Sequence, residues 1–230
     1  VMNYMFENGL FEDYIIRIGA EQEMCLVDST TFKPAPIAME ALKKLKRYPW
    51  AETELARFNL ETTLTPREFK ADCLSELEKE NLEKLNIIRA KVKQLDAEII
   101  LTGILPTLRK FDLEFHNLTP KKRYKALMEA INRQLIGSAY ELRMFGIDEL
   151  LVKHDSPLLE ACNTSFQVHL QVSPANFVSM YNIAQTLAAP VMAIAANSPI
   201  AFGKRLWHES RIAFFLLSIV TRATHKHMLQ

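Results

Sequence analysis

The sequence DYIIRIGAEQEMCLVD, residues 13–28, decides the fold. Its many β-forming residues and its lack of a helix cap predict one long strand. Successive side chains of a strand point to opposite faces of a sheet, so this strand has one polar and one apolar face. The polar face carries Arg17, Glu21, Glu23 and Cys25, and the apolar face carries Ile16, Ile18 and Met24.

The two glutamates of the polar face suggest a metal site. Carboxylates two residues apart on a strand lie ~7 Å from each other, and like charges held together repel unless a cation lies between them. Magnesium is the natural cation because it prefers hard oxygen ligands. The alternative is a solvated strand face on which Arg17 is the counter-charge, since most charged residues lie on the surface.

Two further stretches repeat the pattern. Residues 54–64 (ELARFNLETTL) predict a strand whose polar face carries Arg57, Asn59, Glu61 and Thr63. Residues 164–172 (TSFQVHLQV) predict a strand with an apolar face opposite Gln167, His169 and Gln171. A single histidine in such a place is more often a hydrogen-bonded structural residue than a ligand. Together, however, the three strands predict a sheet curved around a polar, metal-filled cavity.

The rest of the chain alternates predicted helices with strands. Helices are expected at residues 38–48, 72–97, 121–134 and, with interruptions, from 173 onward; strands are expected at 98–105 and 140–152, the latter bending near Gly146. Charged residues at alternating strand positions argue against a doubly wound parallel sheet, which is buried on both faces. We therefore expect an α+β fold, with a curved, mainly antiparallel sheet that has one polar, active-site face and with helices packed outside it.

Composition is typical of a soluble globular protein. The chain has 230 residues, 49% of them hydrophobic, which suffices for one core, and we expect a single domain over residues 1–230. The 28 basic residues nearly balance 27 acidic ones, so no broad field favours nucleic acid or an anionic membrane. Three cysteines without metal-ligand spacing fit a reducing compartment. Because the N-terminus does not resemble a signal peptide, we expect a cytoplasmic protein.

The most apolar stretches are residues 187–202 and 212–220. The first is interrupted by Pro190, Asn197 and Pro199, and the second is shorter than the ~20 apolar residues that span a bilayer. Both stretches predict buried helices rather than membrane spans.

The segment 195–211 (AANSPIAFGKRLWHESR) is the last candidate cluster. Polar residues interrupt an apolar helical run here, and Arg205 and Arg211 offer planar forks suited to carboxylates and phosphates. The alternative is a helix–loop–helix corner with solvated basic residues. The sequence contains neither a Walker-type phosphate loop nor a dinucleotide-binding glycine fingerprint, so ATP would bind at a different kind of phosphate-binding site.

Seven stretches, in order along the chain, resemble the glutamate–cysteine ligase type 2 and carboxylate–amine ligase family, whose catalytic domain is similar to that of glutamine synthetase. They are residues 19–23 (GAEQE), 54–63 (ELARFNLETT), 102–106 (TGILP), 123–124 (RY), 146–155 (GIDELLVKHD), 160–172 (EACNTSFQVHLQV) and 196–211 (ANSPIAFGKRLWHESR). Each stretch alone is a weak signal. The ordered set spans nearly all of the chain and is specific.

The resemblance implies an antiparallel sheet that curls around the active site and a reaction that requires ATP and Mg²⁺. ATP phosphorylates a carboxylate, usually the γ-carboxylate of glutamate. An amine, that of cysteine or another compound, then displaces phosphate to form a γ-glutamyl amide, as in glutathione biosynthesis. Such chemistry needs mainly positioning and charge neutralisation, which metal ions and arginines supply.

The resemblance also assigns roles residue by residue. Metal binding falls to Glu21, Glu23 and Glu61, with Glu54 and Asn59 as weaker candidates. Cofactor contacts fall to Gln167, His169, Asn197, Ser198 and Arg205, and catalytic roles to Arg211 and His169. Many members have histidine where Gln167 stands, although a plant-like branch has glutamine. An amide is a poorer magnesium ligand than a carboxylate, so Gln167 fits a phosphate or substrate group better.

Family members continue beyond this length, so the resemblance implies the N-terminal portion of a catalytic domain whose C-terminal remainder is absent. We expect little or no turnover from the 230 residues alone. One alternative is a ligase for a different acid–amine pair. Another is a non-catalytic nucleotide- or metabolite-binding module. A third is a half-domain that is stable only as an oligomer, for example of identical chains, since an incomplete sheet exposes an edge.

Overall fold

The structure, a computed structural model, describes residues 1–135, 140–154, 157–219 and 228–229. Its helices are α1 (Met2–Glu7), α2 (Ala38–Lys44), α3 (Cys73–Val92), α4 (Lys122–Leu135), α5 (Phe177–Ala195) and α6 (Arg211–Ile219), and its 3₁₀ helices are η1 (Lys93–Leu95), η2 (Lys110–Leu113), η3 (Phe115–Asn117), η4 (Pro157–Cys162) and η5 (Pro174–Asn176). Its strands are β1 (Arg17–Asp28), β2 (Ala51–Thr53), β3 (Asn59–Thr63), β4 (Arg67–Glu68), β5 (Ala97–Ile100), β6 (Tyr140–Phe145), β7 (Glu149–His154), β8 (Phe166–Leu170), β9 (Ile200–Ala201), β10 (Lys204–Arg205) and β11 (Met228–Leu229).

The main sheet has six strands within the described residues, and β1 lies at its centre. Ile18 pairs with both β4 and β8, so these two strands lie on opposite edges of β1. By the same reasoning β3 lies on the β4 edge, because Glu21 pairs with both β3 and β8. All of these pairings are antiparallel, which confirms the expected α+β class with a mainly antiparallel sheet.

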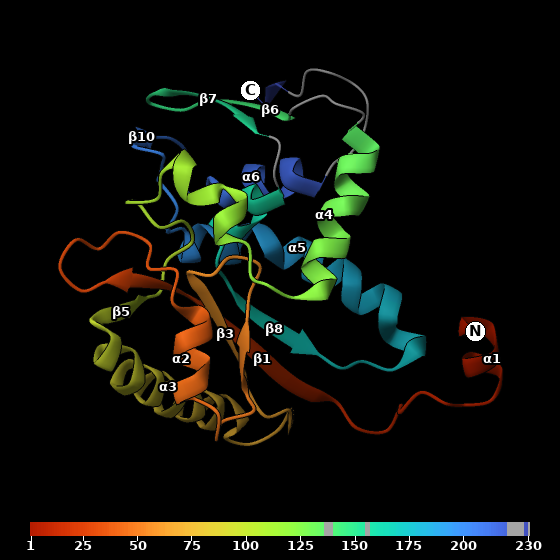
Figure 1. Cartoon of the computed structure of the whole chain (residues 1–230). Coiled ribbons are helices and arrows are strands. Elements are labelled where there is room, and N and C mark those ends of the chain that lie inside the picture. The colour runs from red at the N-terminus through yellow and green to blue at the C-terminus, as the bar shows by residue number, and fades with distance from the viewer. Residues whose placement is uncertain (136–139, 155–156, 220–227, 230) are drawn as a thin grey trace.

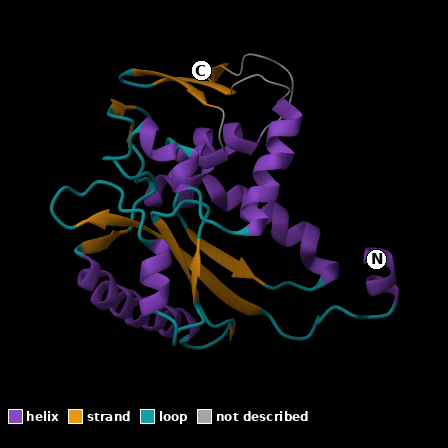
Figure 2. Ribbon diagram, in the orientation of Figure 1, coloured by secondary structure: helices purple, strands orange, loops and turns teal. Residues whose placement is uncertain are grey.

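Helices α2 and α3 cover one face of this sheet (Figures 1 and 2). Met24, Leu26 and Leu60 are fully buried on that face and pack against both helices. Their helical partners include Ala38, Ala41, Leu85, Ile88 and Val92. The helix predicted over residues 72–97 is therefore present, but it ends earlier, at Val92, and is followed by a 3₁₀ turn. Asp96 then adopts φ 52°, a left-handed conformation that stops further helical turns.

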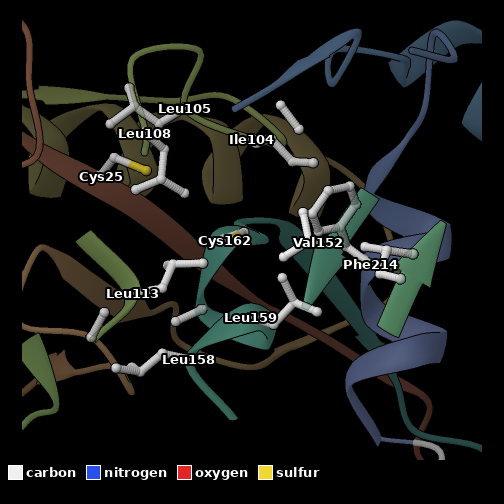
Figure 3. Close-up of a cluster of buried hydrophobic side chains, with 14 of the residues drawn as sticks. Cys25, Ile104, Leu105, Leu108, Leu113, Val152, Leu158, Leu159, Cys162 and Phe214 are labelled. Atoms are coloured by element: carbon white, nitrogen blue, oxygen red, sulfur yellow. The ribbon is translucent and has the colours of Figure 1, made fainter. Parts of the chain in front are cut away.

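The opposite face of β1 is divided along its length. Its C-terminal half contributes Cys25 and Val27 to the largest buried cluster, which Figure 3 shows in close-up. Loop and 3₁₀ segments fill this core with Leu108, Leu113 and Leu158, and α6 inserts Phe214. The N-terminal half of the same face carries Arg17, Glu21 and Glu23 instead. The core thus stops where the polar side chains begin.

The prediction of one bent strand over residues 140–152 is wrong. The chain reverses after Phe145, and β6 and β7 form a hairpin in which Phe145 pairs with Glu149. Gly146 lies at the reversal, where an added Cβ would lie 2.5 Å from the backbone of Leu206. The apolar alternation continues on both sides of this turn, so the sequence pattern did not show the break.

The prediction of a buried helix over residues 187–202 is also wrong. Helix α5 ends at Ala195, and none of its residues is buried; Ile194 is 89% exposed. By length and composition, Pro174–Ala195, with a mean hydropathy of 1.3, is one helix of the described residues that could cross a bilayer. An apolar composition favours burial away from water but does not determine which segment covers the helix. Among the described residues, no core segment covers α5.

Strand β8 and helix α6 also leave apolar side chains exposed that the sequence predicted to be buried. Phe166, Val168 and Leu170 form the predicted apolar face of β8, yet they are 39–60% exposed. In α6, predicted as buried, Ala213 and Phe214 are fully buried, whereas Phe215 is 48% exposed. Residue 220, the end of that predicted helix, lies outside the described residues.

Candidate active site

A group of carboxylates lies on the polar half of β1. The antiparallel register of β1 and β3 places Glu23 directly opposite Glu61, and Glu54 joins them from the segment between β2 and β3. One carboxylate oxygen from each of these residues lies within 4.8 Å of the others. Directly opposed strand residues share a face, so the alternation predicted from the sequence is confirmed at this point.

The Glu23 carboxylate is held in place by β8 and the residues that precede it. The backbone N–H of Ser165 donates to Glu23 Oε2 at 2.7 Å, and the Ser165 hydroxyl donates to the same oxygen at 3.2 Å. Gln167 Nε2 donates to Glu23 Oε1 at 2.9 Å. Both oxygens are thereby fixed in direction, and Gln167 acts on the carboxylate rather than pointing to open space.

Glu21 and His169 lie at the rim of the group. Their side chains are 25% and 53% exposed, and His169 Nε2 lies 3.7 Å from Glu21 Oε2. Arg17 does not neutralise Glu21, as one reading of the sequence had it, because its guanidinium binds Glu12 and Gln171. The strand register places four of the predicted side chains on one face of the sheet, namely Glu21, Glu23, Glu61 and His169. Glu21 and His169 are the two at the rim of the group.

Burial and the repulsion between neighbouring carboxylates raise the pKa values of several glutamates at this site. Burial, followed by the neighbouring Glu54, raises the pKa of Glu61 to about 8. Burial also raises the pKa values of Glu23 and Glu54. Glu160, in η4, has a pKa of about 7, raised by burial and then by Glu23. A group with these pKa values favours a bound cation, which would stabilise the ionised forms.

The residues present fit a magnesium ion. Magnesium is coordinated by oxygen, and Glu23, Glu54 and Glu61 supply carboxylate oxygens from three separate segments. Asn59 is 2% exposed and lies two residues before Glu61 on the same face of β3. Its Oδ1 is buried and has no hydrogen-bond partner among the described residues, and a buried oxygen of that kind requires an explanation. A cation or its bound water would supply one.

The first prediction concerns metal-free stability. The folded-state pKa of Glu61 is about 8, above its ordinary value of 4.5, so the folded protein binds more protons than the unfolded chain between these pH values. The free energy of unfolding should therefore fall as the pH rises across this window. Glu61→Gln removes the penalty. One pKa unit corresponds to ~1.4 kcal/mol, and solvent screens a half-buried group, so we expect a gain of ~2 kcal/mol at pH 8.5.

Urea denaturation in the presence of a chelator, at pH 5 and pH 8.5, measures this gain. Glu98→Gln is the control, because Glu98 is an exposed glutamate of β5, outside the group. It should leave the pH dependence unchanged. A loss of stability in Glu61→Gln at pH 8.5 would show that the ionised carboxylate has a structural partner.

A cavity of about 650 Å³ opens next to Glu21 and His169. Its walls also include Arg17, Trp50 and Lys84. Lys84 Nζ lies 2.7 Å from Glu80, donates to the carbonyl of Thr63 at 2.6 Å and lies over the Trp50 ring. The volume is that of a small-molecule site, and the cavity meets the group of carboxylates at its rim, through Glu21.

The residues predicted from segment 195–211 lie elsewhere. Ser198 Oγ donates to Glu209 Oε1 at 2.7 Å, and the backbone N–H of Asn197 donates to Glu209 Oε2 at 3.3 Å. Arg211 donates to Glu209 and to the carbonyl of Thr164. Arg205 is exposed and pairs with Asp148 at 2.9 Å. Arg205 and Arg211 thus already have protein partners, and the structure does not bring either guanidinium into the carboxylate group.

Sequence reasoning gave too little weight to Glu54 and did not select Glu160 or Ser165. Glu54 lies seven residues before Glu61, outside β3, so strand alternation gives no information on its direction. Ser165 was overlooked because its backbone N–H, which every residue but proline has, makes the shorter bond to Glu23. The one available signal for all three was that they fall within stretches 54–63 and 160–172 of the resemblance.

Comparison with models of protein families gives a match. The family model described as Glutamate-cysteine ligase family 2 (GCS2) matches residues 17–223. A search of curated proteins finds no match. The matched range contains every residue of the carboxylate group and the segment around Arg211.

Proposed function

The chain belongs to the glutamate–cysteine ligase family 2, and on that premise we propose that it is an ADP-forming, magnesium-dependent carboxylate–amine ligase that makes a γ-glutamyl amide. The observation that carries the proposal is the approach of the Glu23, Glu54 and Glu61 carboxylates to within 4.8 Å. Family membership suggests an ATP-dependent ligase, and the family generally uses ATP and Mg²⁺. We further propose a glutamine synthetase-like catalytic fold, in which the polar face of the sheet lines the active site.

In this proposal, Glu23, Glu54 and Glu61 hold magnesium, and Glu21 at the rim is a further candidate ligand. When bound, magnesium neutralises phosphate charge and draws the reacting groups together. Ser165 and Gln167 fix the direction of both oxygens of Glu23. His169, being half exposed beside the cavity, is available to donate a hydrogen bond to a phosphate or substrate oxygen.

The proposed reaction has two steps. An oxygen of the substrate carboxylate attacks the γ-phosphorus of ATP, and ADP leaves, which gives an acyl phosphate. The amine nitrogen then attacks the acyl carbon, loses a proton, and phosphate leaves as the amide forms. The cavity is large enough to hold an amino acid beside Glu21 and His169, and excluding water there would protect the acyl phosphate from hydrolysis.

The test uses the full-length protein with ATP, Mg²⁺, glutamate and cysteine. We expect ADP and phosphate to appear only when glutamate and a divalent cation are both present, together with a γ-glutamyl product detected by mass spectrometry. Replacing cysteine by a panel of amines identifies the acceptor. Glutamate-independent ADP release would reject glutamate as the acid. If magnesium binds and no acid–amine pair yields ADP, the chain is a non-catalytic binding module.

A further inference from the structure

Glu209 is a buried carboxylate, 8% exposed, that joins two ends of the segment from Asn197 to Arg211. It accepts hydrogen bonds from the hydroxyl of Ser198 at 2.7 Å and from Arg211 Nε at 2.5 Å. It also accepts one from the backbone N–H of Asn197. A carboxylate buried to this degree is stabilised by such charge-assisted bonds. The Glu209–Arg211 pair is therefore a fixed structural unit rather than a solvated ion pair.

Arg211 also binds Thr164, the residue that precedes Ser165. Its Nη1 donates to the carbonyl of Thr164 at 3.0 Å. Thr164 is held from other directions as well, because its hydroxyl donates to the carbonyl of Thr102 and its N–H donates to the carbonyl of Gly103 at 3.0 Å. Gly103 permits this approach, since an added Cβ would lie 3.3 Å from Arg211 Cδ and 2.4 Å from Asn197 Oδ1.

The peptide that Arg211 holds leads directly to the carboxylate group. The carbonyl of Thr164 and the N–H of Ser165 belong to the same planar peptide unit, so fixing one fixes the direction of the other. That N–H is the donor to Glu23 Oε2 at 2.7 Å. We propose that Glu209 and Arg211 are positioning residues that orient the Thr164–Ser165 peptide and, through it, the Glu23 carboxylate for metal binding.

This inference rests on the proposed metal site and identifies the residues that keep the Glu23 carboxylate oriented for metal binding. Groups that hold a metal ligand without touching the metal typically change its affinity by ~10–100-fold when they are removed. Arginine suits the task because its rigid fork reaches Glu209 and Thr164 at once. Lysine, with a single nitrogen, would reach one partner at a time. In this assignment Arg211 acts through Glu23 and need not contact a phosphate.

The decisive experiment measures Mn²⁺ binding to the full-length protein by titration calorimetry. We expect Arg211→Met to weaken Mn²⁺ binding ~10–100-fold and Glu209→Gln to act in the same direction. Arg211→Lys should recover part of the loss. The matched control is Arg143→Met, since Arg143 also pairs with a glutamate, Glu149 at 2.7 Å, but on the β6–β7 hairpin. That variant should bind Mn²⁺ like the unmodified protein. Equal affinities in all variants would overturn the inference.

Hydrogen exchange of the Ser165 backbone amide provides a readout that needs no metal. Arg211→Met should speed this exchange relative to Arg143→Met, while amides in α3 exchange at unchanged rates, which separates a local loss from general destabilisation. An unchanged Ser165 rate would reject the positioning role. If the unmodified protein binds no Mn²⁺, the proposed metal site fails, whereas the exchange result still decides whether Arg211 orients Ser165.

Discussion

Glu61→Gln in the full-length protein should lower the rate of glutamate-dependent ADP release by a factor on the order of 10³. Removing a residue that only supports a metal ligand costs ~10–100-fold, and a direct ligand should matter more. The amide is neutral and a weaker magnesium ligand, so less phosphate charge would be balanced in the transition state. Because Glu61 faces Glu23 across two paired strands, the change removes charge at the centre of the group.

The same variant should gain metal-free stability, as argued above, so lost turnover cannot be attributed to unfolding. Opposite effects on activity and stability are typical of residues kept for function. Glu98→Gln should retain turnover within twofold. Turnover of Glu61→Gln within tenfold of the unmodified protein would exclude Glu61 as a ligand. Raising the Mg²⁺ concentration should restore part of the rate if weaker metal binding is the cause.

Phe214→Ala should lower the free energy of unfolding by ~3–5 kcal/mol, the usual cost of deleting a buried aromatic side chain. Phe214 is fully buried, and its ring lies 5.8 Å from that of Phe202. Figure 3 shows Phe214 beside Val152 in the same core. The cavity left by its removal would be bordered by segments from distant parts of the chain, which limits how far the site can collapse.

Phe215→Ala is the matched control, one position along the same helix. Phe215 is 48% exposed, so the loss should be ~1 kcal/mol or less. Urea denaturation of both variants measures the difference. Similar losses for the two would mean that α6 is rotated relative to the arrangement described, and that Arg211, one turn earlier, faces a different partner.

Several features of the site were predictable because they depend on local geometry. Strand alternation has a period of two residues whatever the rest of the fold does. It placed Glu21 and Glu23 on one face of β1, and Asn59 with Glu61 on one face of β3. The helical stripe of α3 was predictable for the same reason. In the helix Leu77, Leu85 and Ile88 do face the core. Leu74 and Leu82, which the same pattern predicts on that face, are instead 58% and 51% exposed.

Other features depended on contacts between distant segments. The hairpin at Gly146 was missed because an apolar alternation continues across the reversal, and only its contact with Leu206 shows why glycine stands there. The exposure of α5 was missed because apolar composition does not reveal which surface covers a helix. In both cases the missing information is which other segment packs against the one in question. A local sequence pattern does not carry that information.

The sequence by itself determined the class of fold, the polar faces of the strands and the family resemblance. Tertiary structure alone decided that Glu61 lies opposite Glu23, that Glu54 turns toward them, and that Arg211 binds Glu209 and the Thr164 carbonyl. Alternation fixes the face of a side chain. Register and loop closure fix its neighbours, and both arise from non-local pairing, where a one-residue slip would move every side chain to the other face.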